Sequence, residues 1–288
     1  MAGWTLGIIG GSGLYDIDGL EDRATRDATS PFGAPSAAFV TGRIGQTRLV
    51  FLPRHDVGHR LPPGDINARA NIDALKRAGC TDILSLSAVG SLKEALPPGT
   101  FVAVDQYIDR TFAREKSFFG PGLAAHVAMA DPVCPRLSGL AAEAARRAGA
   151  AVVEGGTYLA MEGPQFSTRA ESELYRAWGC SVIGMTNMPE AKLAREAELP
   201  YASICMVTDY DCWREGEAAV EVTHVLEVMR ANTAKAKVLI RELALSLPAE
   251  RPASPIDRCL DGAIITAPEA RDAGMVAKLD AVAGRVLR

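Results

Sequence analysis

Short apolar segments alternate along this chain with longer segments whose apolar residues recur every three or four positions. The short segments contain β-branched residues and end in glycine or polar residues, as buried strands do. These predicted strands are residues 6–9, 38–41, 47–52, 81–90, 101–105, 152–161, 182–185 and 203–207. Within residues 152–161, the pair Gly155-Gly156 predicts a bulge or a bend.

The longer segments predict amphipathic helices over residues 65–78, 135–148, 168–178 and 217–246, and a further helix that begins near Asn187. We expect Asp65 to cap the first of these helices and Gly79 to end it. Thr168 and Glu171 have the spacing of a capping box. Because strands and helices alternate, the pattern predicts one α/β domain.

Three prolines within residues 247–255 predict a linker, and a last helix is expected from about Pro268. We therefore expect a main unit over residues 1–246. Residues 247–288 would form a C-terminal linker and helix, packed on the body or on a neighbouring subunit.

Composition excludes several classes of function. With 48% hydrophobic residues in 288, the chain has enough apolar material for a core, and its net charge of −4 disfavours nucleic-acid and polybasic membrane surfaces. No apolar run approaches the ~18 residues of a membrane span, and the N-terminus does not resemble a secretory signal. The 6 scattered cysteines and 4 histidines favour reduced thiols in the cytoplasm and no metal site.

Three hydroxyl residues occur where a backbone turn can approach an anion. Ser12 lies in a glycine-rich turn after the first strand, Ser87 lies with Ala88 at the end of a central strand, and Thr186 precedes a predicted helix. A dinucleotide loop is the rival interpretation of the first turn. It lacks the last glycine of that motif and is followed by no amphipathic helix.

Arg54 and His55 follow a predicted strand directly. A guanidinium group can donate to two oxygens of one phosphate, so the pair is a candidate phosphate clamp. A solvated charge cluster in a surface loop is an equally good interpretation from the residues alone.

Two carboxylates, Asp209 and Asp211, follow the buried strand over residues 203–207. At this spacing an extended chain directs both side chains to one side. Open α/β sheets bind ligands beyond the ends of their strands, so the pair is a candidate for reading a purine base.

Taken together, the motifs resemble those of the trimeric purine nucleoside phosphorylase family. They are Gly10-Gly-Ser-Gly-Leu14, Arg54-His55, Ser87-Ala-Val-Gly-Ser91, Glu162-Gly-Pro-Gln-Phe166, Met185-Thr-Asn-Met-Pro-Glu190 and Thr208-Asp-Tyr-Asp-Cys-Trp213, in the order of that family. The last motif is similar to that of members acting on 5′-methylthioadenosine. The resemblance covers roughly residues 6–245. It implies a catalytic domain over residues 1–246, with a mixed, partly barrel-like sheet surrounded by helices, and a homotrimer.

The resemblance also implies a role for individual residues. Phosphate, a co-substrate rather than a cofactor, would be held by Ser12, Arg54, His55, Ser87, the Ala88 amide and Thr186. The nucleoside would contact Met185 at the ribose, Phe166 at the purine, Val222 and Val225 at the 5′-methylthio group, and His126 from a neighbouring subunit. Asp209 and Asp211 would face the base edge. The sequence departs from the family where Ser12 and Ser87 replace common threonines and Gln165 replaces a common arginine.

These roles predict phosphate-dependent cleavage of the N-glycosidic bond of 5′-methylthioadenosine, giving adenine and 5-methylthioribose 1-phosphate. One proton shared by Asp209 and Asp211, with Asp209 as the favoured donor, would protonate purine N7 while the ionised partner accepts from the 6-amino group. Thr186 would act with them. Alternatives are a methylthioinosine or general purine nucleoside phosphorylase, a hydrolytic nucleosidase and a non-catalytic nucleoside-binding sensor. A nucleotide-dependent oxidoreductase is the most distant of them.

Overall fold

The computed structural model describes residues 3–11, 13–214 and 222–287, with the side chains of residues 222–226 left out. Its described strands, eleven in all, form one mixed sheet. The strands are β1 Thr5–Gly10, β2 Glu21–Arg26, β3 Phe39–Ile44, β4 Thr47–Pro53, β5 Asp82–Ser91, β6 Thr100–Val104, β7 Gln106–Asp109, β8 Ala151–Glu154, β9 Thr157–Ala160, β10 Val182–Gly184 and β11 Tyr201–Asp209. The predicted α/β class with a mixed sheet is therefore confirmed.

Strand β5 is the branch point of the sheet. One path runs in the order β2-β3-β4-β1-β5-β10-β9-β7, while β11 pairs with the other side of β5 and continues to β6 and β8. The pairings of β5 with β1 and with β11 are parallel, and its pairing with β10 is antiparallel. Ten residues long and buried for most of its length, β5 brings its C-terminal end between β10 and β11.

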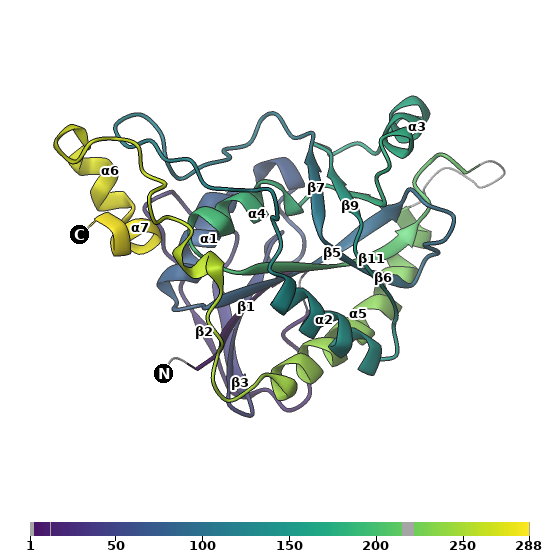
Figure 1. Ribbon diagram of the computed structural model, residues 1–288. Helices are drawn as coiled ribbons and strands as arrows, with labels where there is room; N and C mark the ends of the chain where they lie inside the picture. The colour runs from purple at the N-terminus through teal and green to yellow at the C-terminus, as the bar shows by residue number, and fades with distance from the viewer. Residues whose placement is uncertain (1–2, 12, 215–221, 288) are drawn as a thin grey trace.

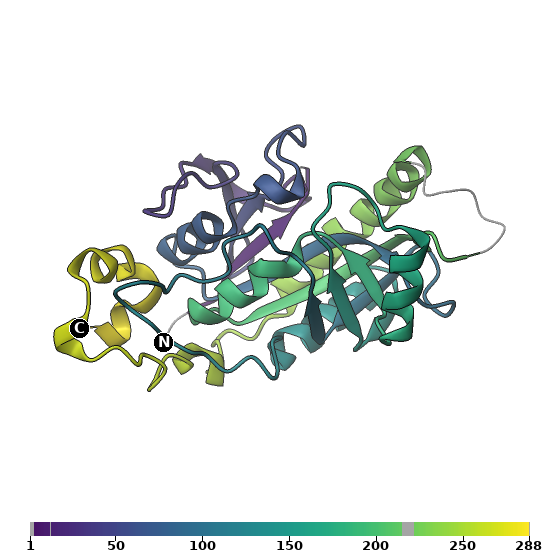
Figure 2. The same ribbon diagram turned by 90° about the horizontal axis from the view of Figure 1, so that it is seen from above.

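Helices cover the sheet on both sides (Figures 1 and 2). Helices α2 (Pro135–Arg147) and α5 (Val222–Ser246) pack against each other over one apolar cluster. Helices α1 (Ala68–Arg77) and α4 (Asn187–Glu196) pack together over a second cluster. Helix α3 (Arg169–Ala177) borders a third, smaller cluster around Trp213. Among the described residues, no helix is both long enough and apolar enough to cross a bilayer.

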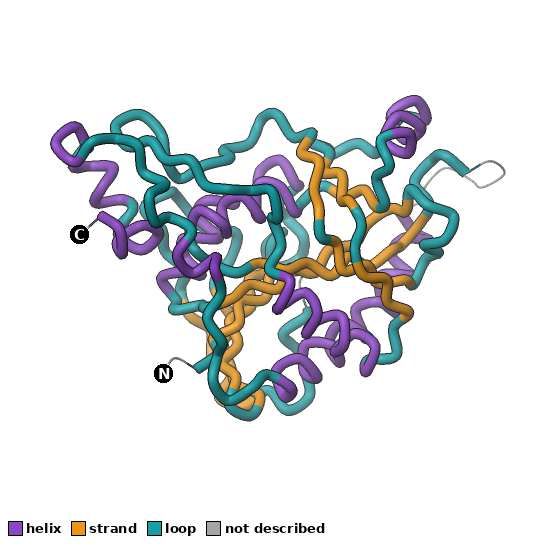
Figure 3. Tube along the Cα trace, in the orientation of Figure 1, coloured by secondary structure: helices purple, strands orange, loops and turns teal. Residues whose placement is uncertain are grey.

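Several local predictions are confirmed and some are wrong. The Thr168–Glu171 capping box is present, but the cap of α1 is Asn67, because Asp65 belongs to a preceding 3-10 turn, Pro63–Asp65. Residues 152–161 form two strands rather than one, because Gly155 and Gly156 both adopt positive φ and turn the chain. The first strand, β8, pairs with β6, and the second, β9, pairs with β7 and β10. Strands β2 and β7 were not predicted. The long stretch over residues 110–126 contains no helix and follows the surface (Figure 3).

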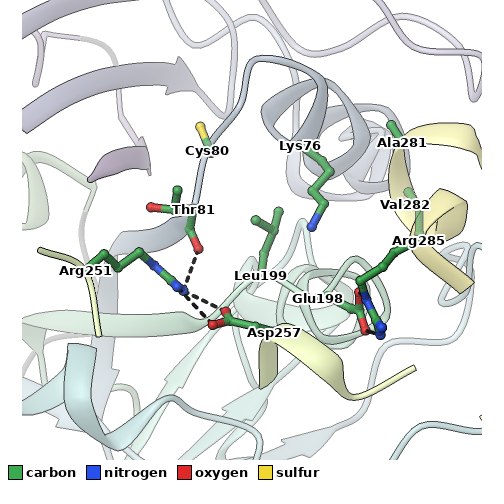
Figure 4. Close-up of a pocket in the computed structure, with 10 residues that line it drawn as sticks. All are labelled: Lys76, Cys80, Thr81, Glu198, Leu199, Arg251, Asp257, Ala281, Val282 and Arg285. Atoms are coloured by element: carbon green, nitrogen blue, oxygen red, sulfur yellow. Dashed lines mark hydrogen bonds and ion pairs between the residues drawn. The ribbon is translucent and has the colours of Figure 1, made fainter. Parts of the chain in front are cut away.

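The C-terminal tail packs on the body through buried and half-buried ion pairs. It contains short 3-10 turns at Pro255–Arg258 and Pro268–Ala270 and the helices α6 (Ala273–Lys278) and α7 (Asp280–Leu287). Arg251 pairs with Asp257, and Arg285 pairs with Glu198 (Figure 4). Arg251 also pairs with Asp82. A cavity of about 240 Å³ remains between tail and body, and the carboxylates around it are engaged by these arginines. We therefore interpret this charge cluster as the attachment of the tail.

Candidate active site

A second cavity, of about 340 Å³, opens where the C-terminal ends of β5 and β11 meet. Parallel strands that end side by side leave such a crevice in open α/β sheets. The predicted site residues that line it are Arg54, His55, Ser87, Ala88, Phe166, Met185, Thr186, Asp209 and Asp211. The structure thus brings together residues that lie up to 157 positions apart in the sequence, from Arg54 to Asp211.

Two predicted hydroxyls form one edge of this cavity. Ser87 Oγ and Thr186 Oγ1 lie 3.0 Å apart, so two adjacent hydroxyls face the same space. Thr186 is the N-cap residue of α4 and its side chain makes no capping bond. Its backbone N–H donates to Tyr158 Oη at 3.3 Å, which holds the turn in place. Two adjacent hydroxyl groups can both donate to one anionic ligand.

Arg54 lies under this edge and is almost entirely buried. Its Nε and Nη2 donate to the two carboxylate oxygens of Glu190, at 3.0 and 3.1 Å, and both side chains are at most 4% exposed. Nη2 also donates to Ser85 Oγ, and Nη1 donates to the Leu86 carbonyl at 3.2 Å. A guanidinium group has five N–H bonds, so among the described residues these four contacts leave one donor on Nη1 for a ligand. Arg54 is therefore a positioned cation and not a mobile clamp.

The His55 ring is fixed by its own loop. Its Nδ1 lies 2.8 Å from the Leu61 carbonyl oxygen, and since a carbonyl only accepts, Nδ1 carries the proton. Burial, and then the neighbouring charge of Arg54, lower the pKa of His55 to about 4. The ring is consequently neutral near pH 7. It stacks on His59, with ring centroids 4.1 Å apart.

The two carboxylates reach the opposite side of the cavity by a bulge and a turn. The pairing of β11 with β5 shifts register between Val207 and Asp209, and Asp211 adopts a left-handed φ of 53°. The expectation of one extended segment is therefore wrong at Asp211. Both residues still line the cavity, and Asp209 Oδ1 accepts the backbone N–H of Asp211 at 2.8 Å. Gly90 permits this, since a Cβ there would lie 3.0 Å from Asp209 Oδ1.

The two carboxylates differ in environment. Asp209 Oδ2 accepts a hydrogen bond from Thr208 Oγ1 at 2.7 Å. Asp211 Oδ2 is buried, and no hydrogen bond reaches it from the described residues. Burial, and to a lesser degree the charge of Asp209, raises the pKa of Asp211. An acid with a raised pKa can donate a proton, and a neighbouring carboxylate can accept a hydrogen bond. Together they suit a nucleobase that needs a proton donor at one atom and an acceptor at another.

Comparison with known proteins accounts for this arrangement. The model of the Phosphorylase superfamily matches residues 5–244, which is most of the chain. This chain belongs to the phosphorylase superfamily. The family membership that the motifs predicted is therefore confirmed.

Relatives within this superfamily match nearly the whole chain. The S-methyl-5′-thioadenosine phosphorylase of Bradyrhizobium diazoefficiens is 61% identical over 285 residues, covering 98% of both chains. That of Cereibacter sphaeroides is 57% identical over 285 residues, also covering 98% of both. The crystal structure of a methylthioadenosine phosphorylase from an antarctic soil metagenomic library is 42% identical with a TM-score of 0.92, covering 98% of this chain and 99% of that one. A Schistosoma mansoni methylthioadenosine phosphorylase in complex with adenine is 38% identical with a TM-score of 0.85, covering 91% of this chain and 99% of that one.

The rest of the cavity of this phosphorylase is mostly apolar. Phe166 lines it with 52% of its surface exposed. Sequence reasoning missed Met161, Ile183, Met206 and Met229, which also line it. Their pattern offers no signal, because Met206 continues a buried strand and Met229 continues the apolar stripe of α5, where core packing is the ordinary interpretation.

Three predicted residues are only partly described or not described. Ser12 lies outside the described residues. Val222 and Val225 belong to α5, but their side chains are outside the described part. Helical spacing puts positions 222 and 225 on the face of Met229, which lines the cavity.

His126 is apart from this cavity. It is exposed, and its N–H donates to the Ala263 carbonyl at 2.9 Å, so it lies beside the C-terminal tail. That His126 contacts the sugar bound by a neighbouring subunit stays a prediction.

Proposed function

We propose that this protein is an S-methyl-5′-thioadenosine phosphorylase, a pentosyltransferase. It transfers the 5-methylthioribosyl group of 5′-methylthioadenosine to inorganic phosphate and releases adenine. The observation that carries the proposal is one cavity of about 340 Å³ that has anion donors on one side and a carboxylate pair on the other. The near full-length similarity to proteins named for this activity supports it.

On the anion side, phosphate is bound by the hydroxyls of Ser87 and Thr186 and by the remaining Nη1 donor of Arg54. Breaking the glycosidic bond leaves positive charge on the sugar, and a bound phosphate dianion beside C1′ stabilises that charge. We assign Ser12 and the Ala88 amide to the same anion, on the motifs given above. The new bond forms between a phosphate oxygen and C1′ as the C1′–N9 bond breaks.

On the base side, the carboxylate pair holds one proton and donates it to purine N7 as the electron pair of the broken bond moves onto the base. Burial raises the pKa of Asp211, and its buried Oδ2 has no hydrogen-bond partner among the described residues, so Asp211 is the better candidate to carry that proton before the base binds. Asp209, the donor favoured from the sequence, then accepts from the 6-amino group or takes over the proton. Single substitutions of Asp209 and Asp211 test which of the two carboxyl groups donates the proton.

The pair also predicts the choice of substrate. Adenine has a donor at C6, and a 6-oxopurine has an acceptor there, which an ionised carboxylate repels. A site that hydrogen-bonds a substrate N–H rejects the mismatched analogue by factors of up to about 10⁴. The apolar wall around Met229 prefers a methylthio group to a hydroxyl, by only about 1–3 kcal/mol.

The test is phosphorolysis of methylthioadenosine, methylthioinosine, adenosine and inosine, each with and without phosphate. We expect methylthioadenosine to have the highest kcat/KM and cleavage to require phosphate. Faster cleavage of the inosine compounds contradicts the base-reading argument. Cleavage without phosphate identifies a nucleosidase, and binding without cleavage identifies a sensor.

We further infer that the protein is a homotrimer, with His126 reaching a neighbour's cavity and residues 1–246 as the catalytic domain. Phe112, on the same surface loop as His126, is 82% exposed, and Ile265 of the adjacent tail is 63% exposed. Exposed large apolar side chains such as these two are frequent at subunit interfaces. Sedimentation equilibrium of the full chain tests the assembly state.

A further inference from the structure

His55 has one ring nitrogen committed to its own loop. Nδ1 donates to the Leu61 carbonyl at 2.8 Å, and the Leu61 N–H donates back to the His55 carbonyl at 3.1 Å. These two bonds close the loop over residues 55–61 and fix the orientation of the ring. Because the ring also lines the active-site cavity, only Nε2 is left to meet a ligand there.

The charge state of this ring follows from the groups that face it. Burial disfavours a second proton on the ring, and so do the neighbouring cation of Arg54 and the stacked ring of His59. The Leu61 carbonyl and Glu190 favour a second proton, but Glu190 is already paired with Arg54. In the neutral ring with Nδ1 protonated, Nε2 presents a lone pair and no hydrogen. Within the described part of the chain, no hydrogen bond occupies Nε2.

Such a nitrogen is the wrong partner for a bare anionic oxygen. A lone pair that faces a second lone pair leaves two buried acceptors without a donor, which costs free energy. The same nitrogen is a good partner for an acidic O–H. Inorganic phosphate near neutral pH carries one such O–H as HPO₄²⁻, whereas sulfate carries none.

We propose that His55 Nε2 accepts the hydrogen bond of the phosphate P–O–H and thereby selects a protonated tetrahedral anion over sulfate. The inference rests on the proposed function, because it assumes that phosphate binds beside Arg54, Ser87 and Thr186. The three unprotonated oxygens of HPO₄²⁻ then face the donors of those residues. The hydrogen bond from this O–H to His55 Nε2 also fixes the orientation of the phosphate in the site.

The proposal separates phosphate from sulfate by the protons that each takes up on binding. HPO₄²⁻ brings its own hydrogen, so its binding at about pH 8 requires no proton from solvent. Sulfate binds well only when His55 gains a proton, so its affinity rises as pH falls, by up to tenfold per pH unit. With sulfate, His55 Nε2 is an acceptor that has no donor. We therefore expect sulfate to bind more weakly than phosphate at this pH, by a factor of about ten or more.

Calorimetric titration of the full-length protein with phosphate and with sulfate, in two buffers of different ionisation enthalpy at about pH 8 and about pH 6, tests this. We expect phosphate to bind at the higher pH without proton uptake, and sulfate to bind much more weakly there. We expect the difference to narrow at the lower pH as sulfate binding takes up protons. Uptake of about one proton with phosphate at the higher pH, or equal affinities there, overturns the proposal.

His55→Asn gives a second measurement, because its side-chain amide can turn N–H donors toward either anion. We expect the preference for phosphate over sulfate to shrink to less than about threefold, from about tenfold or more in the wild type. An unchanged preference contradicts the assignment to His55. Failure of the proposed function is distinguishable, since it appears as absent phosphate-dependent cleavage of methylthioadenosine, whatever the proton uptake.

Discussion

The ion pair beneath the phosphate site gives a prediction that joins stability to ligand binding. Glu190 accepts from Arg54 Nε at 3.0 Å, from Arg54 Nη2 at 3.1 Å and from Tyr201 Oη at 2.7 Å. Its side chain is 4% exposed and that of Arg54 is 3% exposed. Glu190→Gln keeps the shape of the residue, removes its charge and leaves the Arg54 cation buried without a counterion.

Removing one partner of a buried ion pair costs about 3–5 kcal/mol, since the remaining charge stays out of water. We therefore expect the variant to lose that much of its free energy of unfolding in the absence of phosphate. The matched control is Glu173→Gln, because Glu173 pairs with Arg176 at the surface and is 53% exposed. An exposed pair contributes about 0–1 kcal/mol, so this control should unfold nearly as the wild type does.

Urea denaturation at one protein concentration, with and without saturating phosphate, measures both effects. Phosphate supplies the negative charge that Arg54 has lost, so it should stabilise Glu190→Gln more than it stabilises the wild type. A loss of less than about 1 kcal/mol, as for the control, would refute the argument that this pair holds Arg54. Equal stabilisation of variant and wild type by phosphate would place the anion away from Arg54.

Three further changes test other parts of the account. Asp211→Asn should lower kcat/KM by about 10²–10⁴-fold. Because the Asp211 pKa is raised in the folded protein, its ionisation costs stability as pH rises through that pKa. The variant should therefore unfold less readily than the wild type at neutral pH, whereas Asp209→Asn should lose activity without that gain. Arg251→Met should lower the free energy of unfolding by about 1–3 kcal/mol and speed proteolysis of the tail, because the fully buried Asp82 loses one of its two arginine partners. A tail that is cut no faster than in the wild type would contradict this. Phe112→Asp should shift the sedimentation equilibrium toward monomers, and an unchanged mass would exclude Phe112 from the interface.

The sequence predicts those parts of the molecule that are determined locally. The capping box of Thr168 and Glu171 lies within four residues and forms as expected. Buried strands such as β5 and β11 are rich in apolar and β-branched residues and were predicted, with ends shifted by one or two residues. Strand β2 was missed because nearly all of its residues are exposed and polar, so neither alternation nor apolar content marks it.

The sequence does not predict contacts made between distant elements. Arg54 and Glu190 are 136 positions apart, and no pattern in either segment shows that they pair. A phosphate clamp and a solvated cluster were equally good interpretations of Arg54, and the structure shows a buried cation with most of its donors engaged. Asp211 departs from the extended segment for a local reason, because its left-handed φ is stabilised by the Asp209 side chain and not by a glycine.

The central claim is that one cavity binds phosphate and an adenine nucleoside for phosphorolysis. The most direct test is to incubate the full-length protein with 5′-methylthioadenosine and to quantify adenine and 5-methylthioribose 1-phosphate, with and without phosphate. The account predicts both products in equal amounts, formed only when phosphate is present. Adenine formed at the same rate without phosphate, or no adenine under either condition, would contradict it.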